Sequence, residues 1–422
     1  MNGRRVRPSS LTGQIVAPAS KSYTHRAAVV AALSERSVTV ERPLESEDTQ
    51  ATLRGLARMG TPVVASALRW SFGGAGLLDS RRGADVDCRS SGTTLRFLLS
   101  VAALRRVPTR FRCSRQLARR PTQPLIACLR QRGARIRRVG SMHLSVTGPL
   151  TAGRFFLDAS ESSQFLSSLL LVLPRLDGPS TIVVTGRLPS RPYVEATEFL
   201  LRQARAPIRH GGPRWEIPAP SPYSLRRIRV PGDASSAAPL WVGGALPGGD
   251  VAVSGLELRW PQADLEVLAL LERAGGEVNR TRSGARVRHG RLRAFTFRFD
   301  HCPDLLPLAG VIASFARPGT SRLLGGGQAA QKESDRVHET GRLAQALGAR
   351  VGQRAGELWI RAGRLPARLS YEPPEDHRVV MAAAVAATGL AETSRLGSAG
   401  AVRKSYPGFW ADLSTLGARG GP

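Results

Sequence analysis

One phrase recurs along the chain at nearly even intervals: the end of an amphipathic helix, a glycine-type stop, and a short run typical of a β-strand. The six occurrences are LARMGTPVV, LRQRGARI, LRQARAPI, LERAGGEV, AQALGARV and LSTLGAR, with stops at Gly60, Gly133, Arg205, Gly275, Gly348 and Gly417. The intervals are 73, 72, 70, 73 and 69 residues. Glycine just past a helix end is the usual left-handed stop, and the Val/Ile positions after it predict a buried strand. We therefore expect six α/β units, arranged as two lobes of three with the active site between them.

Length and composition agree with a two-domain enzyme. The chain has 422 residues, 42% of them hydrophobic, which is enough for a large core. No apolar run approaches the roughly 20 residues of a membrane span, so we expect a soluble, untargeted, cytoplasmic protein. The four cysteines form no CxxC pair and the seven histidines show no ligand spacing. Neither a metal nor an organic cofactor is expected.

The positive charge of the chain raises nucleic-acid binding as an alternative function. The net charge is +29, but the basic residues are spread over the whole length and only 5% of residues are aromatic, unlike the stacking stripe of single-strand binders. Of the 61 basic residues only three are lysine: Lys21, Lys332 and Lys404. This suggests that those three places need a compact, titratable ammonium that arginine cannot supply.

Several polar clusters stand where a helix is expected to begin, which is typical of sites for anionic groups. Lys21, Ser22 and Arg26 lie in PASKSYTHRA, SSGTTLR opens an apolar run, and Ser162-Ser163-Gln164 supplies hydroxyl and amide donors. Helices are predicted over residues 91–104, 163–173 and 376–387, and a loop near the lobe junction over 211–222. If KESDR is helical, Lys332 and Arg336 share one face.

Taken in order, these segments resemble the 5-enolpyruvylshikimate-3-phosphate synthases. The matching phrases are PASKSYTHRA, SSGTTLR, ARRP, SSQF, SRPY, GDASSA, PDLLP, KESDR, DHR and KSYPGF. The resemblance implies a two-lobed α/β fold in which each lobe has three βαβαββ units with helices packed inward, an inside-out α/β barrel. It implies one lobe over residues 20–231, which binds shikimate 3-phosphate. Residues 1–19 and 232–422 form the other, with the catalytic carboxylates and part of the phosphoenolpyruvate site.

The resemblance also implies substrates and site residues. The substrates are shikimate 3-phosphate and phosphoenolpyruvate, and we expect a monomer with no nucleic-acid or membrane partner. The residues implied for shikimate 3-phosphate are Ser22, Arg26, Ser162, Ser163, Gln164, Ser190 and Tyr193. Those implied for phosphoenolpyruvate are Lys21, Gly92, Arg120, Arg336, Arg378 and Lys404, and Asp304, Gln328 and Lys332 complete the expected substrate-binding set.

The reaction that the resemblance implies needs an acid–base group at each end of the new bond. The methylene of phosphoenolpyruvate gains a proton while the 5-hydroxyl of the acceptor adds to C2, and loss of phosphate and of a methyl proton then restores the vinyl group. Asp304 is the candidate for taking the hydroxyl proton, and Glu333 for shuttling the methyl proton. Lys21 is expected to assist either step and to steady the departing phosphate.

A few positions depart from the family pattern. Ser90 stands in place of asparagine, Ala19 in place of glycine, and Gln328 in place of asparagine or glutamate, while Gln116 leaves open whether Arg115 or Arg120 completes the phosphoenolpyruvate site. The phrases YTHRA, PDLLP and SYPGF look like the archaeal-type branch. Alternative acceptors are another cyclic hydroxy acid or UDP-N-acetylglucosamine, although the transferase that uses the latter has Lys-Asn at the first motif and a differently spaced cysteine.

Overall fold

The computed structural model of the chain describes residues 3–74 and 76–421 and consists of two compact units. The middle unit is Ala19–Pro231, and the terminal unit combines Met1–Pro18 with Gly232–Pro422. The sequence places the first boundary between residues 19 and 20, whereas Ala19 here belongs to the middle unit; the second boundary is the same. The expected lobe limits at residues 1 and 422 lie outside the described residues.

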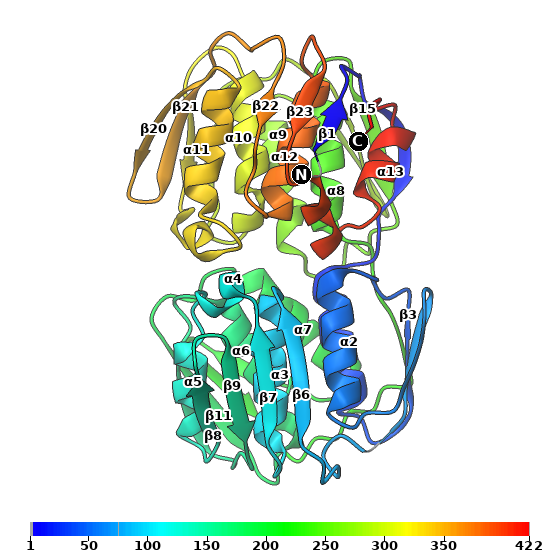
Figure 1. The fold of residues 1–422 in the computed structure, drawn as a ribbon, viewed down its shortest axis with the longest axis vertical. Helices are drawn as coiled ribbons and strands as arrows, with labels where there is room; N and C mark the ends of the chain where they lie inside the picture. Colours follow the sequence, from blue (N-terminus) through cyan, green and yellow to red (C-terminus); the bar gives the residue numbers. More distant parts are fainter. Residues whose placement is uncertain (1–2, 75, 422) are drawn as a thin grey trace. The chain divides into compact units, whose positions relative to one another are not determined.

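The middle unit has three sheets of one kind, each a motif with a parallel pair of strands followed by a helix and a β-hairpin, and in two of them a helix also joins the parallel pair (Figure 1). Its four-stranded sheets have the orders β14-β3-β5-β4, β6-β7-β9-β8 and β10-β11-β13-β12. The strands are β3 (Val38–Glu41), β4 (Val63–Ser66), β5 (Arg69–Phe72), β6 (Ala84–Arg89), β7 (Thr109–Cys113), β8 (Arg135–Val139), β9 (His143–Thr147), β10 (Arg154–Asp158), β11 (Ser180–Thr185), β12 (Arg209–Gly211), β13 (Arg214–Ile217) and β14 (Arg227–Arg229). Residues alternate between buried and exposed along β6, so one face of its sheet meets the core and the other meets solvent.

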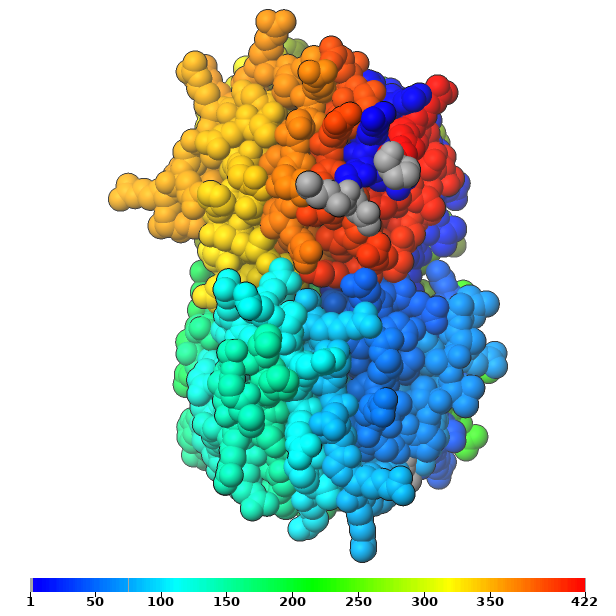
Figure 2. Space-filling view, in the orientation of Figure 1, coloured from blue at the N-terminus to red at the C-terminus, as the bar shows by residue number. Residues whose placement is uncertain are grey.

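The terminal unit has two sheets of the same kind, β2-β15-β17-β16 and β18-β19-β21-β20, and a three-stranded sheet, β1-β23-β22. Their strands are β1 (Arg4–Val6), β2 (Thr12–Val16), β15 (Asp250–Ser254), β16 (Glu277–Thr281), β17 (Gly284–Arg288), β18 (Thr296–Arg298), β19 (Ser321–Leu324), β20 (Arg350–Arg354), β21 (Glu357–Arg361), β22 (Ser370–Tyr371) and β23 (Ser394–Leu396). In the third sheet, the N–H groups of Arg5 and Arg7 donate to the carbonyls of Gly421 and Arg419 at 2.8 and 2.7 Å. Figure 2 shows this N-terminal segment, dark blue, against the red C-terminal one. The end of the chain thus lies where the other sheets have a fourth strand.

Two strands complete sheets whose other strands lie far away in the sequence. β2 precedes the first helix of the middle unit in sequence, yet it pairs in parallel with β15 of the terminal unit, with Ile15 opposite Val253. β14 ends the middle unit and pairs in parallel with β3, with Ile228 opposite Val40. Because β2 and β14 each lie in the unit whose sheet they complete, the chain passes from one unit to the other twice, at residues 18–19 and 231–232.

Each motif contains two helices, which differ in kind. The first helix is apolar nearly all round, and such a helix is stable only when buried: all twelve residues of α8 and of α12 are buried. These helices are α1 (Lys21–Ala32), α3 (Gly92–Leu104), α6 (Ser163–Leu170), α8 (Ala234–Ala245), α10 (Leu306–Phe315) and α12 (His377–Thr388). The second helices are amphipathic and cover the sheets: α2 (Glu47–Arg58), α5 (Gln123–Arg130), α7 (Arg191–Gln203), α9 (Glu266–Arg273), α11 (Arg336–Ala346) and α13 (Phe409–Thr415). In the described part of the chain, every helix falls short of the length and apolar character of a membrane span.

The six stops of the sequence repeat all have left-handed backbone conformations. Their φ angles are 110° at Gly60, 99° at Gly133, 58° at Arg205, 92° at Gly275, 80° at Gly348 and 98° at Gly417. Each follows the amphipathic helix of its motif by two or three residues. The repeat therefore marks the same turn in every unit, and Arg205 adopts it although it carries a Cβ atom that crowds this conformation.

The predicted helices are found with small shifts. α3 starts after its N-cap Ser91, and α12 after its N-cap Asp376. α6 ends at Leu170, and a separate 3₁₀ turn follows at Leu173–Arg175. The predicted loop over 211–222 is wrong in part, since it contains strand β13. Trp215 of this strand is buried and its indole N–H donates to Glu198 Oε1 at 2.7 Å, and burial of this side chain fixes the strand despite its proline-rich surroundings.

Replacing Arg205 by glycine should stabilise the protein. Glycine adopts positive φ without steric cost, whereas arginine is strained there. We expect Arg205→Gly to raise the free energy of unfolding by about 0.5–1 kcal/mol in denaturant titrations. The matched control is Gly417→Arg, where an added Cβ would meet only the Ser10 carbonyl oxygen, at 3.6 Å, but φ is also positive, at 98°. It should lower the free energy of unfolding, and equal stability of both variants and wild type would contradict this account.

Candidate active site

In the middle unit, the N-termini of α1, α2, α3 and α6 are held close together by polar side chains. Lys21, the first residue of α1, places its Nζ 3.1 Å from Asp48 Oδ2 at the start of α2. Gln164 in the first turn of α6 donates through Nε2 to Thr93 Oγ1 of α3 at 3.1 Å. Helix N-termini carry unpaired backbone N–H groups and the positive end of the helix dipole. The cluster can therefore attract phosphate or carboxylate.

Arg26 lies beneath this cluster rather than on it. Its side chain is only 2% exposed and donates to the carbonyls of Ser22 (2.9 Å) and Tyr193 (2.8 Å) and to Thr197 Oγ1 (2.7 Å). Burial lowers the pKa of Arg26 from its usual value to about 10, which leaves the guanidinium charged at neutral pH. Arg26 thus fixes the backbone at Ser22 and Tyr193, two of the residues expected to bind shikimate 3-phosphate.

Arg96, like Arg26, is a buried arginine that holds expected site residues in place, and sequence analysis assigned it no role. It is buried in α3 and donates to Gln164 Oε1 at 2.7 Å and to the carbonyl of Pro121 at 2.8 Å. These two bonds hold the expected Gln164 side chain and the turn that follows Arg120. A charged residue inside the apolar run of SSGTTLRFLLSVAAL was the available signal, because a buried arginine needs specific acceptors.

Gly92 and Arg120 are in direct contact. A Cβ atom added to Gly92 would lie 2.9 Å from Arg120 Nη1 and 3.1 Å from its Cζ, so only glycine lets the guanidinium lie against the start of α3. Arg115 is instead exposed, in the short helix α4 (Arg115–Ala118) that Ser114 caps. Of the two arginines left open by the sequence, Arg120 is the one that packs on the expected Gly92.

Serine residues position the remaining helix starts of the middle unit. Ser162 is the N-cap of α6, and its Oγ accepts from the Gln164 N–H at 3.3 Å. Ser163 follows as the first, buried residue of α6. Ser190 precedes α7 with φ +50° and ψ 43°; a left-handed conformation in a residue other than glycine is uncommon and often marks a ligand-binding segment.

The terminal unit carries a second cluster, built around one buried arginine. Arg336 is 1% exposed and meets three carboxylates: Asp376 through both Nε (2.8 Å) and Nη2 (3.1 Å), Asp304 through Nη1 (2.8 Å), and Glu333 through Nη2 (2.7 Å). Burial alone would lower the pKa of Arg336, but the three carboxylates raise it above its usual value. The arginine is permanently charged and joins the start of α12, the start of α11 and the turn before α10.

Asp304 lies at the meeting point of three cations. Its Oδ1 is 2.8 Å from Arg336 Nη1 and 3.3 Å from Lys332 Nζ, and its Oδ2 is 3.7 Å from Arg378 Nη2. Burial would raise the pKa of Asp304, yet the nearby charges of Lys332, Arg336 and Arg378 hold it well below its usual range. Asp304 is therefore an ionised carboxylate with a proton affinity that depends on what else neutralises those cations.

The helical interpretation of KESDR is wrong. α11 starts only at Arg336, and Lys332 has an extended conformation at the end of a 3₁₀ turn, Gly327–Gln331. Asp335 ends the extended segment by capping α11 through the His338 N–H at 3.0 Å. Lys332 and Arg336 nevertheless meet, because both reach Asp304.

Two other expected residues of this unit are held by backbone carbonyls. Gln328 donates through Nε2 to the carbonyl of Asp300 at 2.6 Å. Lys404 is 9% exposed and donates through Nζ to the carbonyl of Glu375 at 2.8 Å. The second bond places the ammonium next to the segment that leads into Asp376 and α12.

Asp264 is a further buried carboxyl that sequence analysis did not find. It is 1% exposed, its Oδ2 accepts a hydrogen bond from Ser235 Oγ, and within the described residues its Oδ1 has no hydrogen-bond partner. Burial, and next the charge of Asp304, raise the pKa of Asp264 to about 6. Ser235 also links it to Arg378, whose Nη1 donates to the Ser235 carbonyl at 2.7 Å. PQADLEVL gives no periodic signal that distinguishes this aspartate from a helix cap.

Comparison with solved structures identifies the fold. EPSP synthase from Acinetobacter baumannii superimposes with a TM-score of 0.83 at 22% identity, over 99% of this chain and 100% of that one. The enolpyruvyl transferase NikO from Streptomyces tendae gives 0.78 at 17%, over 99% and 98%. The chain therefore has the two-lobed enolpyruvyl transferase fold, as the resemblance implied.

Sequence comparison identifies the family within that fold. The profile of EPSP synthase (3-phosphoshikimate 1-carboxyvinyltransferase) matches residues 6–413. The 3-phosphoshikimate 1-carboxyvinyltransferase of Methanocorpusculum labreanum is 34% identical over 418 residues, covering 98% of both chains. That of Aeropyrum pernix is 37% identical over 427 residues, covering 98% of this chain and 95% of its own. The chain belongs to the EPSP synthase family and is a transferase, and these archaeal relatives agree with the archaeal-type phrases.

Removing the ionisable group of Asp264 should change how stability depends on pH. Because the folded-state pKa of about 6 lies above the unfolded value, the protonated carboxyl stabilises the fold at low pH, and this contribution is lost as pH rises through about 6. The side-chain amide that Asp264→Asn introduces cannot ionise. The free energy of unfolding of wild type minus that of the variant should therefore fall by about 2 kcal/mol between pH 4 and 7.

Asp158→Asn is the control for this measurement, since hydrogen bonds from Ser160 lower the pKa of Asp158 and the trend should have the opposite sign. Urea titrations at four pH values would measure both differences. A flat difference for Asp264→Asn would show that this carboxyl titrates as an ordinary aspartate.

Proposed function

We propose that this chain transfers the carboxyvinyl group of phosphoenolpyruvate to the 5-hydroxyl of shikimate 3-phosphate and releases phosphate, in the cytoplasm and as a monomer. The observation that carries the proposal is the carboxylate of Asp304 among three cations, Lys332, Arg336 and Arg378, in a chain of the EPSP synthase family. Such a cluster offers both a proton acceptor and the charge to hold an anionic substrate. The reaction draws on residues of both units.

Shikimate 3-phosphate is proposed to bind to the cluster of the middle unit. Helix-start hydroxyls, an amide and a phenol suit a phosphate and a ring with hydroxyl groups. The proposed ligands are Ser22, Ser162, Ser163, Gln164, Ser190 and Tyr193. Arg26 and Arg96 act as positioning residues, because their hydrogen bonds hold Ser22, Tyr193 and Gln164 in place.

Phosphoenolpyruvate is proposed to bind to cations from both clusters: Lys21 and Arg120, next to Gly92, and Lys332, Arg336, Arg378 and Lys404, with Gln328 beside them. Arg378 supports this assignment most directly. Its Nε is a buried donor with no hydrogen-bond partner in the part of the chain that the structure describes, and an unsatisfied buried donor costs about 1–3 kcal/mol. A substrate carboxylate or phosphate would satisfy it.

Proton transfer is proposed to depend on the same charges. Lys332, Arg336 and Arg378 keep Asp304 ionised, but an anionic substrate that neutralises them would raise the pKa of Asp304 and make it a better acceptor for the 5-hydroxyl proton. Glu333, bonded to Arg336 at 2.7 Å, is proposed to deliver a proton to the methylene carbon and to remove one from the resulting methyl group. Lys21 assists and stabilises the departing phosphate.

Phosphate release from phosphoenolpyruvate tests the activity and the role of Lys21. Wild type should release phosphate only when shikimate 3-phosphate is present. Lys21→Arg should lower kcat about 100-fold or more, since a guanidinium is larger than an ammonium and cannot act as a proton donor. Arg209→Lys, at an exposed position of β12, is the matched control and should keep wild-type kcat.

Release that is independent of shikimate 3-phosphate, or that instead requires UDP-N-acetylglucosamine or another cyclic hydroxy acid, would refute the proposed acceptor. Wild-type turnover in Lys21→Arg would refute the proposed role of this lysine without affecting the acceptor.

Substitution of Gly92 tests the contact with Arg120. The Cβ of Gly92→Ala would come within 2.9 Å of the guanidinium, so Arg120 must move away from its position at the start of α3. We expect the KM for phosphoenolpyruvate to rise about tenfold, a loss of about 1.4 kcal/mol, with a smaller change in the KM for shikimate 3-phosphate. Gly352→Ala, where the nearest atom is 3.9 Å away, should leave both values unchanged, and equal behaviour of the two variants would contradict the assignment of Arg120.

A further inference from the structure

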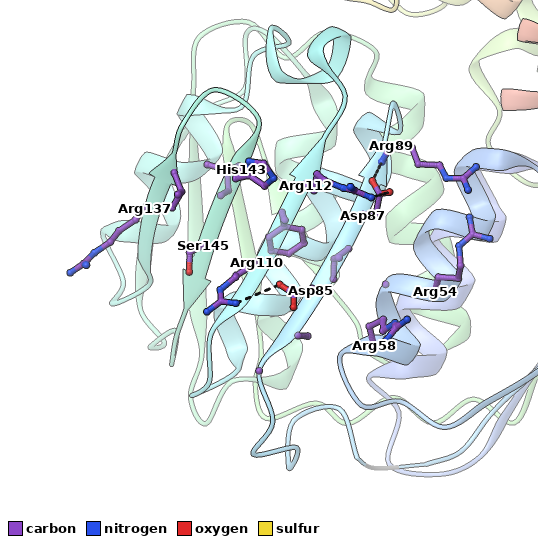
Figure 3. Close-up of a pocket in the computed structure, with 17 residues that line it drawn as sticks. Arg54, Arg58, Asp85, Asp87, Arg89, Arg110, Arg112, Arg137, His143 and Ser145 are labelled. Atoms are coloured by element: carbon purple, nitrogen blue, oxygen red, sulfur yellow. Dashed lines mark hydrogen bonds and ion pairs between the residues drawn. The ribbon is translucent and has the colours of Figure 1, made fainter.

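The solvent face of the sheet β6-β7-β9-β8 in the middle unit has a hollow of about 980 Å³, bounded on one side by α2 (Figure 3). Figure 2 shows the blue segment that contains α2 directly beside the lighter blue segment that contains β6 on this surface. The floor is formed by the sheet, and none of the residues assigned above to substrates lines the hollow. Its volume is in the range of small-molecule sites.

Arginine is concentrated in this hollow beyond the general richness of the chain in arginine. Six of its 17 lining residues are arginine, against 58 of 422 in the whole chain. Two of the six, Arg110 and Arg112, face aspartates across the strands: Arg112 Nη2 is 2.7 Å from Asp87 Oδ2, and Arg110 Nη1 is 3.9 Å from Asp85 Oδ1. The others are Arg54 and Arg58 on α2, Arg89 on β6 and Arg137 on β8.

Arg54 and Arg89 extend toward each other across the gap between α2 and the end of β6 (Figure 3). Their charges repel: after burial, the positive charge of Arg89 is the largest cause of the lowered pKa of Arg54, which Asp87 only partly offsets. This repulsion between two neighbouring cations is unfavourable. An anion between them would remove the repulsion.

The backbone of Arg89 is shaped to keep this arrangement. Its φ is +49°, a conformation uncommon for residues other than glycine, and the pairing of β6 with β7 shifts register between Asp87 and Arg89. The Arg89 N–H donates to Asp87 Oδ1 at 2.9 Å, and its carbonyl accepts from the Ser114 N–H at 2.7 Å. Register shifts of this kind redirect a side chain and are enriched at functional sites. Here the shift turns Arg89 toward α2.

We propose that Arg54 and Arg89, flanked by Arg58 and Arg112, form a second anion site that binds a small molecule with two or more phosphate groups, separate from the substrates. Guanidinium pairs bind phosphate oxygens through several parallel hydrogen bonds. The hollow has the volume of a small ligand, and its exposed rim offers no row of aromatic side chains on which the bases of a single strand would stack. A phosphorylated metabolite therefore fits it better than nucleic acid.

Calorimetric titration with sodium tripolyphosphate tests this site without reference to catalysis. Arg54→Gln and Arg89→Gln should each raise the Kd at least tenfold at about 150 mM salt, an ionic strength that screens distant surface charges. Arg209→Gln, which removes one exposed charge from another sheet of the same unit, should change the Kd less than about twofold. The double variant Lys21→Gln/Arg120→Gln should bind like wild type, because these residues belong to the candidate active site. Unchanged thermal unfolding would show that each variant is folded.

Four outcomes would overturn the proposal. The first is that wild type fails to bind tripolyphosphate. The second is that Arg209→Gln weakens binding as much as Arg54→Gln does, which would indicate a general attraction to a basic surface. Binding is lost in Lys21→Gln/Arg120→Gln and kept in Arg54→Gln, which places the anion in the active site. A single strand of about 12 nucleotides binds more tightly than tripolyphosphate, with all variants affected alike, which indicates a nucleic-acid surface.

Discussion

A guanidinium removed almost wholly from water needs acceptors for its hydrogen bonds, and in the terminal unit three carboxylates supply them and organise the candidate site. Arg336 binds Asp376, Asp304 and Glu333 at 2.7–3.1 Å, and these residues come from separate segments of the chain. Loss of one partner of such a buried pair typically costs about 3–5 kcal/mol. The positions of both proposed proton-transfer groups thus follow from the packing of a single side chain.

The middle unit uses buried arginines differently. Arg26 and Arg96 donate to backbone carbonyls and neutral side chains. In the terminal unit the arginines are paired with acids. The first arrangement suits a site for a phosphorylated ring with hydroxyl groups, and the second suits chemistry in which protons and negative charge move. The division agrees with the proposed roles of the two clusters.

Sequence predicted the fold well because its signals are local and repeated. The stops from Gly60 to Gly417 lie in one turn type, and the apolar runs after Ser91 and Asp376 are buried helices. The candidate site was predicted less completely, since burial of polar groups depends on tertiary packing. Nothing local distinguishes Arg26, which holds backbone, from Arg120, which packs on Gly92. Whether KESDR is helical stayed a condition in the sequence, because spacing cannot show that Asp335 caps a helix that starts only at Arg336.

The pairing of β2 and β14 with strands far away in the sequence has a consequence for how the polypeptide can be divided. Residues 19–231 form one uninterrupted segment with all three of their sheets complete, so a single excised fragment carries everything that the middle unit needs. The terminal unit has no such fragment, because β1 and β2 reach it from the opposite end of the chain. Trimming at either terminus would fray the same sheet, where the first residues pair with β23 and with the last described ones.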